Sequence, residues 1–316
     1  MSMDLTDVSG LVWRAIRPED ESALKVLDSA CKAVDGDEPV SDLPGDALKA
    51  AAEHMDNALG VTAPNEIVAV AWVHANPPQE GLQQVMLGGR VHPEFRRRGI
   101  GEALIAWAES RALNLAKPDI TLQLMIANEA LTEDANALYL DYGYENIFTE
   151  FMLVRPLNEP LPEIPLPEGL TERRWDTVSA PLFFQAYAEG FKDRLGDVVP
   201  VKEEWIAGYA EEDEDFRPDL SRVVLEDNNP AAFVTCEVSG QTGWIAQIAV
   251  VQERRRKGLA RAILVQALKR LQEEGCVEAA LHVNANNTRA AATFFDAGFT
   301  RRLTRARFLK EIATGR

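Results

Sequence analysis

The chain has 316 residues, of which 46% are hydrophobic and 26% charged, and its formal net charge is −17. The length is enough for two domains that each bury a core, and the composition is ordinary for a globular protein. The average field of so acidic a protein repels nucleic acid and anionic bilayers. No apolar run approaches the roughly 20 residues of a membrane span, and the polar N-terminus does not resemble a signal peptide. We therefore expect a cytoplasmic protein that binds neither nucleic acid nor membrane.

The cysteines and histidines give no pattern of a disulfide framework or a metal site. Cys31, Cys236 and Cys276 are widely spaced, and the four histidines are not clustered. Structural zinc sites and disulfide scaffolds place such residues in pairs at short spacing. We expect three reduced, partly buried thiols and no metal.

The first half of the chain is expected to form a sheet flanked by helices. Hydrophobic periodicity and turn signals place its elements in a definite order. They are a strand at 12–16, helices at 21–34 and 46–54, strands at 66–74 and 83–91, a helix at 102–113, a strand at 120–126, a helix at 134–142 and a strand at 147–154.

A proline-rich segment then separates the two halves. Prolines recur through residues 156–169, and they forbid a regular helix while favouring an extended, semi-rigid linker. We therefore expect one domain at 1–155, a linker at 156–169 and a second domain at 170–316.

The second half repeats this order of elements. It is expected to hold a strand at 171–175, helices at 182–190 and 202–209, strands at 222–226, 231–238 and 244–251, a helix at 261–271, a strand at 279–283, a helix at 289–295 and a strand at 302–309. An antiparallel meander followed by a strand–helix–strand unit predicts an α/β fold with a mixed, mostly antiparallel sheet in each half.

One segment occurs twice, about half a chain length apart. Each copy follows an apolar strand and opens a helix, and each contains Arg-x-x-Gly-x-Gly/Ala. Free N–H groups and the positive dipole end at a helix start suit a pyrophosphate, and glycines let the backbone approach it. The arginines face either phosphate or solvent. The predicted anion-binding residues are Val91, Arg96, Arg97, Arg98, Gly99, Ile100 and Gly101, and then Val250, Arg255, Arg256, Lys257, Gly258, Leu259 and Ala260.

The repeated turn resembles motif A of the GNAT superfamily of N-acetyltransferases. A second motif of that superfamily, a helix that ends in Gly-Phe or Gly-Tyr, also occurs twice, at 135–144 and 287–299. The resemblance covers nearly the whole chain as two tandem modules. It implies acetyl-CoA as co-substrate, with its pyrophosphate on the turn and its pantetheine arm near Asn284 and Asn287. Asn287 is equally suited to capping a helix.

The chemistry of such an enzyme requires a base for the amine, a donor for the oxyanion and an acid for the departing thiolate. The resemblance places the acid at Tyr139, where the second half has Phe294, although Tyr139 also fits a core aromatic. Domain two has the fuller cofactor signature, because Thr132 stands where Asn287 would be. The catalytic half therefore stays open, and so does the base, for which the candidates are His74, Glu226, Glu237 and His282.

Within the superfamily the chain resembles mycothiol synthases, in its tandem architecture, in residues 33–36 and 39–40, and in the entry to the linker at 155–157. That resemblance implies acetylation of a cysteinyl amine by the C-terminal module, with Asp42 near an acidic residue that contacts substrate. The module here departs from the pattern, because Phe294 replaces a tyrosine and no glutamate lies near Trp244.

The leading expectation is an N-acetyltransferase that moves acetyl from acetyl-CoA to a primary amine of a small molecule. The alternatives are a mycothiol-synthase-type acetylation of a cysteinyl amine and a non-catalytic acyl-CoA-binding or regulatory protein. An interaction protein with vestigial sites is disfavoured, because both turns keep their glycine and arginine positions. The assembly is expected to be a monomer with pseudo-dimeric domains or a homodimer.

Overall fold

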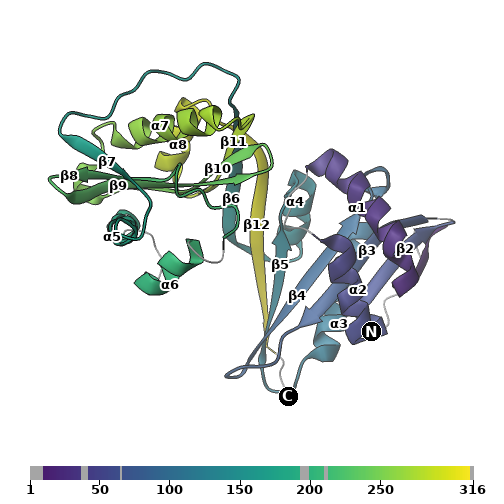
Figure 1. Cartoon of the computed structure of the whole chain (residues 1–316). Helices are drawn as coiled ribbons and strands as arrows, with labels where there is room; N and C mark the ends of the chain where they lie inside the picture. The colour runs from purple at the N-terminus through teal and green to yellow at the C-terminus, as the bar shows by residue number, and fades with distance from the viewer. Residues whose placement is uncertain (1–9, 37–41, 65, 193–198, 210–212, 314–316) are drawn as a thin grey trace. The chain divides into compact units, whose positions relative to one another are not determined.

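A computed structural model describes residues 10–36, 42–64, 66–192, 199–209 and 213–313. The chain forms two compact units (Figure 1). Unit 1 takes the chain up to Glu150 together with the stretch that begins at Leu303, and unit 2 is Phe151–Arg302.

Unit 1 contains a sheet in the order β1-β2-β3-β4-β5-β12. Neighbouring strands are antiparallel except β4 and β5, which are parallel. Its elements are β1 (Val12–Ala15), α1 (Glu21–Asp35), α2 (Leu43–Glu53), β2 (Ala58–Ala63), β3 (Glu66–Ala75), β4 (Leu82–Val91), α3 (Ile100–Leu115), β5 (Thr121–Asn128), α4 (Glu133–Asp141), the start of β6 (Glu145–Pro156) and most of β12 (Thr300–Ala313), with short 3-10 turns at Pro18–Asp20, Met55–Asn57 and Pro93–Phe95.

The two faces of this sheet carry different helices. Successive side chains of a strand point to opposite faces, so Val70 and Trp72 of β3 pack with α1 and α2. Ala71 and Val73 of the same strand pack with residues of α3. The sheet is therefore covered on both sides, as buried strands with few polar residues require.

Unit 2 repeats the design with the order β6-β11-β10-β9-β8-β7. Its elements are the rest of β6, then β7 (Leu170–Arg174), α5 (Ala180–Gly190), α6 (Lys202–Ala207), β8 (Arg222–Glu226), β9 (Asn229–Ser239), β10 (Thr242–Val250), a 3-10 turn (Gln252–Arg254), α7 (Leu259–Glu273), β11 (Glu278–Asn284) and α8 (Thr288–Asp296). One core packs α7 and α8 on the sheet, and an aromatic core that includes Trp175 and Trp205 lies under α5 and α6.

The predicted fold class, a mixed sheet flanked by helices in each half, is confirmed. One strand was missed: β2, whose sequence Ala58-Leu59-Gly60-Val61-Thr62-Ala63 is rich in residues of low strand propensity. It forms because it lies between β1 and β3 with its first four residues buried. Tertiary packing therefore outweighs local preference here.

The proline-rich segment that follows β6 has no helix or strand over 157–169. It lies against α7, where the Gln266 amide donates to the Ile164 carbonyl at 2.8 Å and Gln272 donates to the Leu157 carbonyl. Leu157 is almost fully buried in the core beneath α7. The segment is thus extended and held along its length.

The structure divides the chain differently from the predicted domains at 1–155 and 170–316. The last strand of the chain, β12, lies mostly in unit 1, and the end of β6 lies in unit 2. β12, yellow in Figure 1, pairs antiparallel with β5 from Ala306↔Asn128 to Ala313↔Thr121. Residues 151–155 of β6 belong to unit 2. The sheet of unit 1 is therefore completed by residues that come more than 150 positions after the rest of it.

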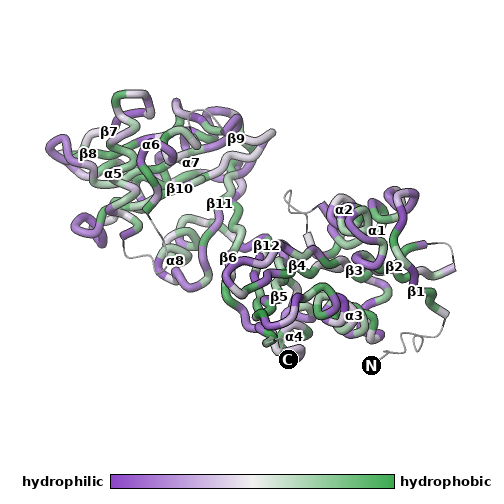
Figure 2. The backbone as a smooth tube through the Cα atoms, turned by 90° about the horizontal axis from the view of Figure 1, so that it is seen from below, coloured by the Kyte–Doolittle hydropathy of each residue, from purple (hydrophilic) through white to green (hydrophobic). Residues whose placement is uncertain are grey.

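Hydrophobic stretches gather along the strands inside each unit, and many of the turns between strands are hydrophilic (Figure 2). Within the described ranges, no helix is long and apolar enough to cross a membrane. Cys31, Cys236 and Cys276 are buried, more fully than the partly buried thiols expected from the sequence.

Candidate active site

The sheet of unit 1 opens between its two parallel strands. β4 and β5 pair from Leu82↔Thr121 to Leu87↔Ile126. Beyond Leu87, β4 continues to pair only with β3, while β5 continues with β12. A cavity of about 640 Å³ lies at this opening, lined by residues of α2, β3, β4, β5, α3 and α4. The open strands leave main-chain groups that can bind an extended ligand.

The predicted turn borders this cavity. Gly99 precedes α3 with φ +79°, and Arg97 also has positive φ, at 62°. The first main-chain bond of the helix runs from Ala103 N–H to Gly99 C=O, so the N–H groups of the preceding turn have no partner in the helix. Gly99 and Gly101 line the cavity. This backbone geometry is the one that an anion site at this position requires, and the site itself stays a prediction.

Unit 2 builds the same turn. Gly258 has φ +78°, Arg256 has φ +62°, and Ala262 N–H donates to Gly258 C=O. The strands differ, because parallel pairing of β10 with β11 ends at Trp244↔Ala280 and β10 has a bulge between Ile245 and Gln247. The turn before the helix is therefore the same in the two units, whereas the strand beside it differs.

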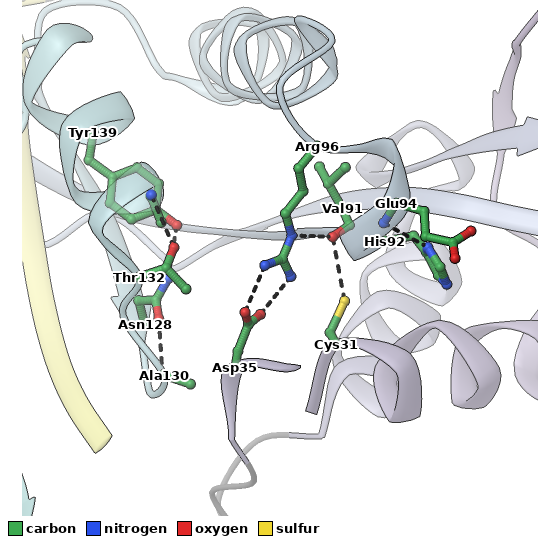
Figure 3. A network of polar contacts seen from close by, with 11 residues as sticks. Cys31, Asp35, Val91, His92, Glu94, Arg96, Asn128, Ala130, Thr132 and Tyr139 are labelled. Atoms are coloured by element: carbon green, nitrogen blue, oxygen red, sulfur yellow. Dashed lines mark hydrogen bonds and ion pairs between the residues drawn. The ribbon is translucent and has the colours of Figure 1, made fainter. Parts of the chain in front are cut away.

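The side chains of the motif arginines Arg96 and Arg255 make hydrogen bonds within the protein. Arg96 Nε donates to the Val91 carbonyl at 3.1 Å, and its other nitrogens meet both carboxylate oxygens of Asp35 at 2.6 and 2.7 Å (Figure 3). In unit 2, Arg255 Nε donates to the Val250 carbonyl at 3.1 Å, and another nitrogen donates to the Gly190 carbonyl at 2.7 Å. These side chains hold the turn in shape.

The remaining predicted residues of the two turns divide into exposed cations and buried supports. Arg97 is exposed and ion-paired with Asp134 at 2.6 Å, while Arg98 donates to the Glu94 carbonyl and lies over the Phe95 ring. Arg256 and Lys257 are also exposed, whereas Ile100 and Leu259 are buried in the core, and Ala260 is partly buried.

Tyr139 on α4 lies between core and cavity. Its ring packs against Phe308 at 4.9 Å, and its hydroxyl accepts a hydrogen bond from Asn128 Nδ2 at 3.1 Å (Figure 3). It lines the cavity. Burial raises the pKa of the phenol above its ordinary value, so at neutral pH the hydroxyl carries its proton. Tyr139 was interpreted either as the general acid or as a core aromatic. The structure is compatible with both, because the ring packs in the core and the hydroxyl lies at the cavity.

Asn128 was missed from the sequence. Its side-chain oxygen accepts from Ala130 N–H at 3.1 Å, as Asn284 accepts from Asn286 N–H at 2.9 Å. Thr132 and Asn287 then cap α4 and α8 in the same way. The sequence signal that could have revealed Asn128 is its position at the end of β5, which matches that of Asn284 at the end of β11. Both units therefore carry the asparagine at the strand end, and they differ at the helix cap, which is Thr132 in unit 1 and Asn287 in unit 2.

Phe294 occupies in unit 2 the place that Tyr139 has in unit 1. It lies on α8, buried in the core, with its ring 6.0 Å from that of Phe299. This position supplies no proton donor.

Asp42, predicted as a substrate contact, caps α2 by accepting from Gly45 N–H at 3.1 Å and is not among the residues that line the cavity. Residues 39–40, also part of that resemblance, lie outside the described residues. Asp46, one turn later on α2, does line the cavity, and the sequence did not single it out.

The candidate bases have structural partners of their own. His74 Nδ1 lies 2.9 Å from Glu53, Glu226 pairs with Arg254, and the His282 ring lies 5.3 Å from that of Trp244. Burial, with the nearby Asp213 and Asp215 charges, raises the pKa of Glu237 to about 7. None of the four lines the cavity of unit 1.

A sheet that opens between two parallel strands beside a glycine turn at a helix start, with the turn repeated in unit 2, fits the tandem acyl-group transferase expected from the sequence. The family models agree: the GNAT acetyltransferase domain matches residues 56–146 and the GNAT acetyltransferase family matches residues 182–299, together about two thirds of the chain. The chain therefore belongs to the GNAT acetyltransferases, with one domain in each half, and it is an N-acetyltransferase.

Curated relatives are mycothiol acetyltransferases at modest identity. That of Thermobispora bispora is 26% identical over 297 residues, covering 90% of this chain and 94% of the relative, and that of Salinispora arenicola is 28% identical over 222 residues, covering 67% and 68%. A solved GCN5-related N-acetyltransferase from Sphaerobacter thermophilus has a TM-score of 0.66 at 25% identity and 98% coverage of each chain. A tandem GNAT protein from the clavulanic acid biosynthesis pathway has a TM-score of 0.54 at 16% identity, with 95% of this chain and 98% of that chain covered, which shows a shared fold.

Proposed function

We propose that the chain transfers the acetyl group of acetyl-CoA to a primary amine of a small molecule, and that unit 1 carries out the transfer. The observation that supports this choice is the Tyr139 hydroxyl at the cavity, where unit 2 has the buried Phe294. A phenol that stays protonated at neutral pH can give its proton to the departing thiolate.

The residues of unit 1 divide the work. The N–H groups at Gly99 to Gly101 and the exposed Arg97 and Arg98 would hold the pyrophosphate. A main-chain N–H of the open part of β4 would stabilise the oxyanion. Attack by a neutral amine nitrogen forms the C–N bond, the C–S bond breaks, and Tyr139 protonates the sulfur while the nitrogen loses a proton to solvent.

Unit 2 would bind a second acetyl-CoA without turnover. Its turn has nearly the same main-chain angles as that of unit 1, and we expect Asn284 and Asn287 to contact the pantetheine arm. Without a proton donor at Phe294, such a site would serve stability or regulation. In this proposal, non-catalytic binding of acyl-CoA, which the sequence left open for the whole protein, is a property of unit 2 alone.

The experiment is a calorimetric titration of acetyl-CoA, paired with an assay of CoA release. We expect two sites in the unaltered protein, one site and no activity in Gly99→Glu, and one site with activity in Gly258→Glu. Each glutamate places bulk and negative charge against the pyrophosphate. Matched controls are Gly81→Glu and Gly240→Glu, since these glycines also have positive φ with nothing within 4 Å of a Cβ.

Two outcomes would contradict the proposal. Activity that survives Gly99→Glu and disappears in Gly258→Glu would move catalysis to unit 2. No binding at micromolar acetyl-CoA would contradict the use of this donor.

A second candidate is the acetylation of a cysteinyl amine, favoured by the mycothiol acetyltransferases that resemble most of the chain. The test compares cysteine amide with alanine amide as acceptors. A preference of at least about tenfold for the cysteinyl amine, or about 1.4 kcal/mol, would support it, and equal rates would contradict it.

A further inference from the structure

The cavity of unit 1 extends beyond the turn and Tyr139 to the start of α2 and to β3. Asp46 and Trp72 line this end. Neither residue holds the donor or protonates the leaving group in the function proposed above.

Trp72 forms a flat wall beside the opening of the sheet. It is paired with Gly88 on β4, the first residue after the last parallel pair, Leu87↔Ile126. A Cβ at Gly88 would lie 2.1 Å from Cζ2 and 2.2 Å from Cε2 of the indole. The indole therefore lies directly across β4, and only glycine at position 88 leaves it room.

Asp46 presents a carboxylate without a partner. Among the described residues its side chain makes no hydrogen bond or ion pair, and burial together with the Asp42 charge raises its pKa. The basic side chains near it are Lys49 on its own helix and His74 on β3, and His74 is paired with Glu53.

Three other carboxylates that line the cavity are ion-paired. Asp35 pairs with Arg96, Asp134 with Arg97, and Glu129 with Arg307, each within 2.7 Å. Glu102 and Asp141, which also line it, lie on α3 and α4 rather than on α2.

Arg90 on β4 also lines this cavity. The charge of Arg90 acts on Cys31 and Tyr139, whereas the charges that act on Asp46 are Asp42, Lys49 and His74.

We propose that Asp46 and Trp72 bind a positively charged group of the acceptor, so that the preferred substrate is an amine with a second cationic group. The amine that reacts must be neutral to attack the thioester, and a second ammonium supplies binding without being consumed. A carboxylate and an aromatic face both attract such a group, most strongly where water is partly excluded. This inference rests on the proposed function of unit 1.

The test compares 1,4-diaminobutane with 1-aminobutane as acceptors in the full-length protein. We expect kcat/KM to favour the diamine by about tenfold or more, the size of one charge-assisted hydrogen bond. Asp46→Asn should bring the ratio close to one by raising KM for the diamine, with kcat and acetyl-CoA affinity nearly unchanged. The control is Glu66→Gln, which removes one exposed negative charge from unit 1 outside the cavity.

Equal values for the two amines in the unaltered protein, or an unchanged ratio in Asp46→Asn, would overturn the inference. Binding of acetyl-CoA without acetylation of either amine would also overturn the inference about the acceptor, while acetyl-CoA would remain the assigned donor. Failure to bind acetyl-CoA would overturn the proposed function itself, and the calorimetric titration reports that separately.

Discussion

Tyr139 has two roles that can be tested apart, because its ring packs in the core and only its hydroxyl oxygen can donate a proton. Because the ring packs against Phe308 and the hydroxyl meets Asn128, Tyr139→Phe keeps the packing and removes only the proton donor. We expect kcat to fall by about 10²-fold or more, with acetyl-CoA affinity unchanged by calorimetry. Tyr142→Phe is the control, since that hydroxyl donates to the Glu102 carbonyl and does not line the cavity. A kcat within twofold of the unaltered protein would return Tyr139 to a purely structural role.

The pH dependence of kcat follows from the same residue. A general acid acts while protonated, so kcat is lost as pH rises through its pKa. Burial raises the pKa of Tyr139 above the ordinary value of about 10. We expect no basic limb of kcat from this group below about pH 10, measured with saturating acceptor. A basic limb near pH 8 that disappears in Tyr139→Phe would show a lowered pKa instead.

Arg96 and Arg97 are neighbours with different expected effects. Arg96→Ala leaves the Asp35 carboxylate, whose side chain is 7% exposed, without its partner, so we expect a loss of about 3–5 kcal/mol in the free energy of unfolding. Arg97→Ala breaks an exposed ion pair worth about 0–1 kcal/mol and should instead weaken acetyl-CoA binding. Denaturant unfolding and calorimetry together separate the two. Equal stability losses would contradict this assignment.

Glu237 in unit 2 predicts a stability change with the opposite sign to that of a salt-bridged acid. Its pKa is raised to about 7 by burial and by Asp213 and Asp215, so the folded state binds a proton more tightly than the unfolded state. Stability is therefore lost as pH rises from about 4.5 to about 7. Glu237→Gln should raise Tm at pH 8 more than at pH 4.5. An equal change in Tm at both pH values would show that the carboxyl is not perturbed.

A site residue can be predicted from sequence when the residues that determine its geometry lie close to it in the chain. The turn at Gly99 and Gly258 is a short-range motif, so it could be predicted from spacing. Asp46, Trp72 and Asn128 reach one cavity from α2, β3 and β5, and nothing in their local sequence specifies that they meet. Asp42 was named from a resemblance, which gives only an approximate position, and Asp46, which lines the cavity, lies one helical turn further along.

At the scale of elements, order and type were predictable where periodicity is strong. β2 was missed because its burial, rather than its residues, makes it a strand. The partners of β6 and β12 were not predictable in the same way. An apolar strand pattern specifies which face is buried, but it does not say which of two similar sheet edges the strand will join.

The repeated turn predicts equal backbone requirements in the two units. Gly99 and Gly258 share φ near +79° and have open space around a Cβ, so Gly→Ala at either position should cost about 1–2 kcal/mol from conformation alone. We expect similar losses of unfolding free energy for the two variants in denaturant titrations. A loss in only one unit would show that the other turn relaxes without its glycine.

At the scale of the whole molecule, unit 1 depends on the end of the chain. β12 pairs with β5 along eight register positions and places Phe308 against Tyr139. A chain that ends at residue 302 should therefore lose the protection of β5 from hydrogen exchange and lose CoA release, while α7 stays protected. A chain that ends at residue 313 is the control. Full protection of β5 in the shorter chain would contradict the dependence.

The position of β12 in unit 1 also orders events during synthesis. A ribosome that has finished residue 150 must add the whole of unit 2 before β12 emerges, which takes on the order of 10–30 s at typical elongation rates. Through that interval β5 has an unoccupied edge of the kind that invites mispairing. A polypeptide without residues 303–313 would lack the strand that completes unit 1, so the sheet of unit 1 can form fully only after the residues of unit 2 have been made.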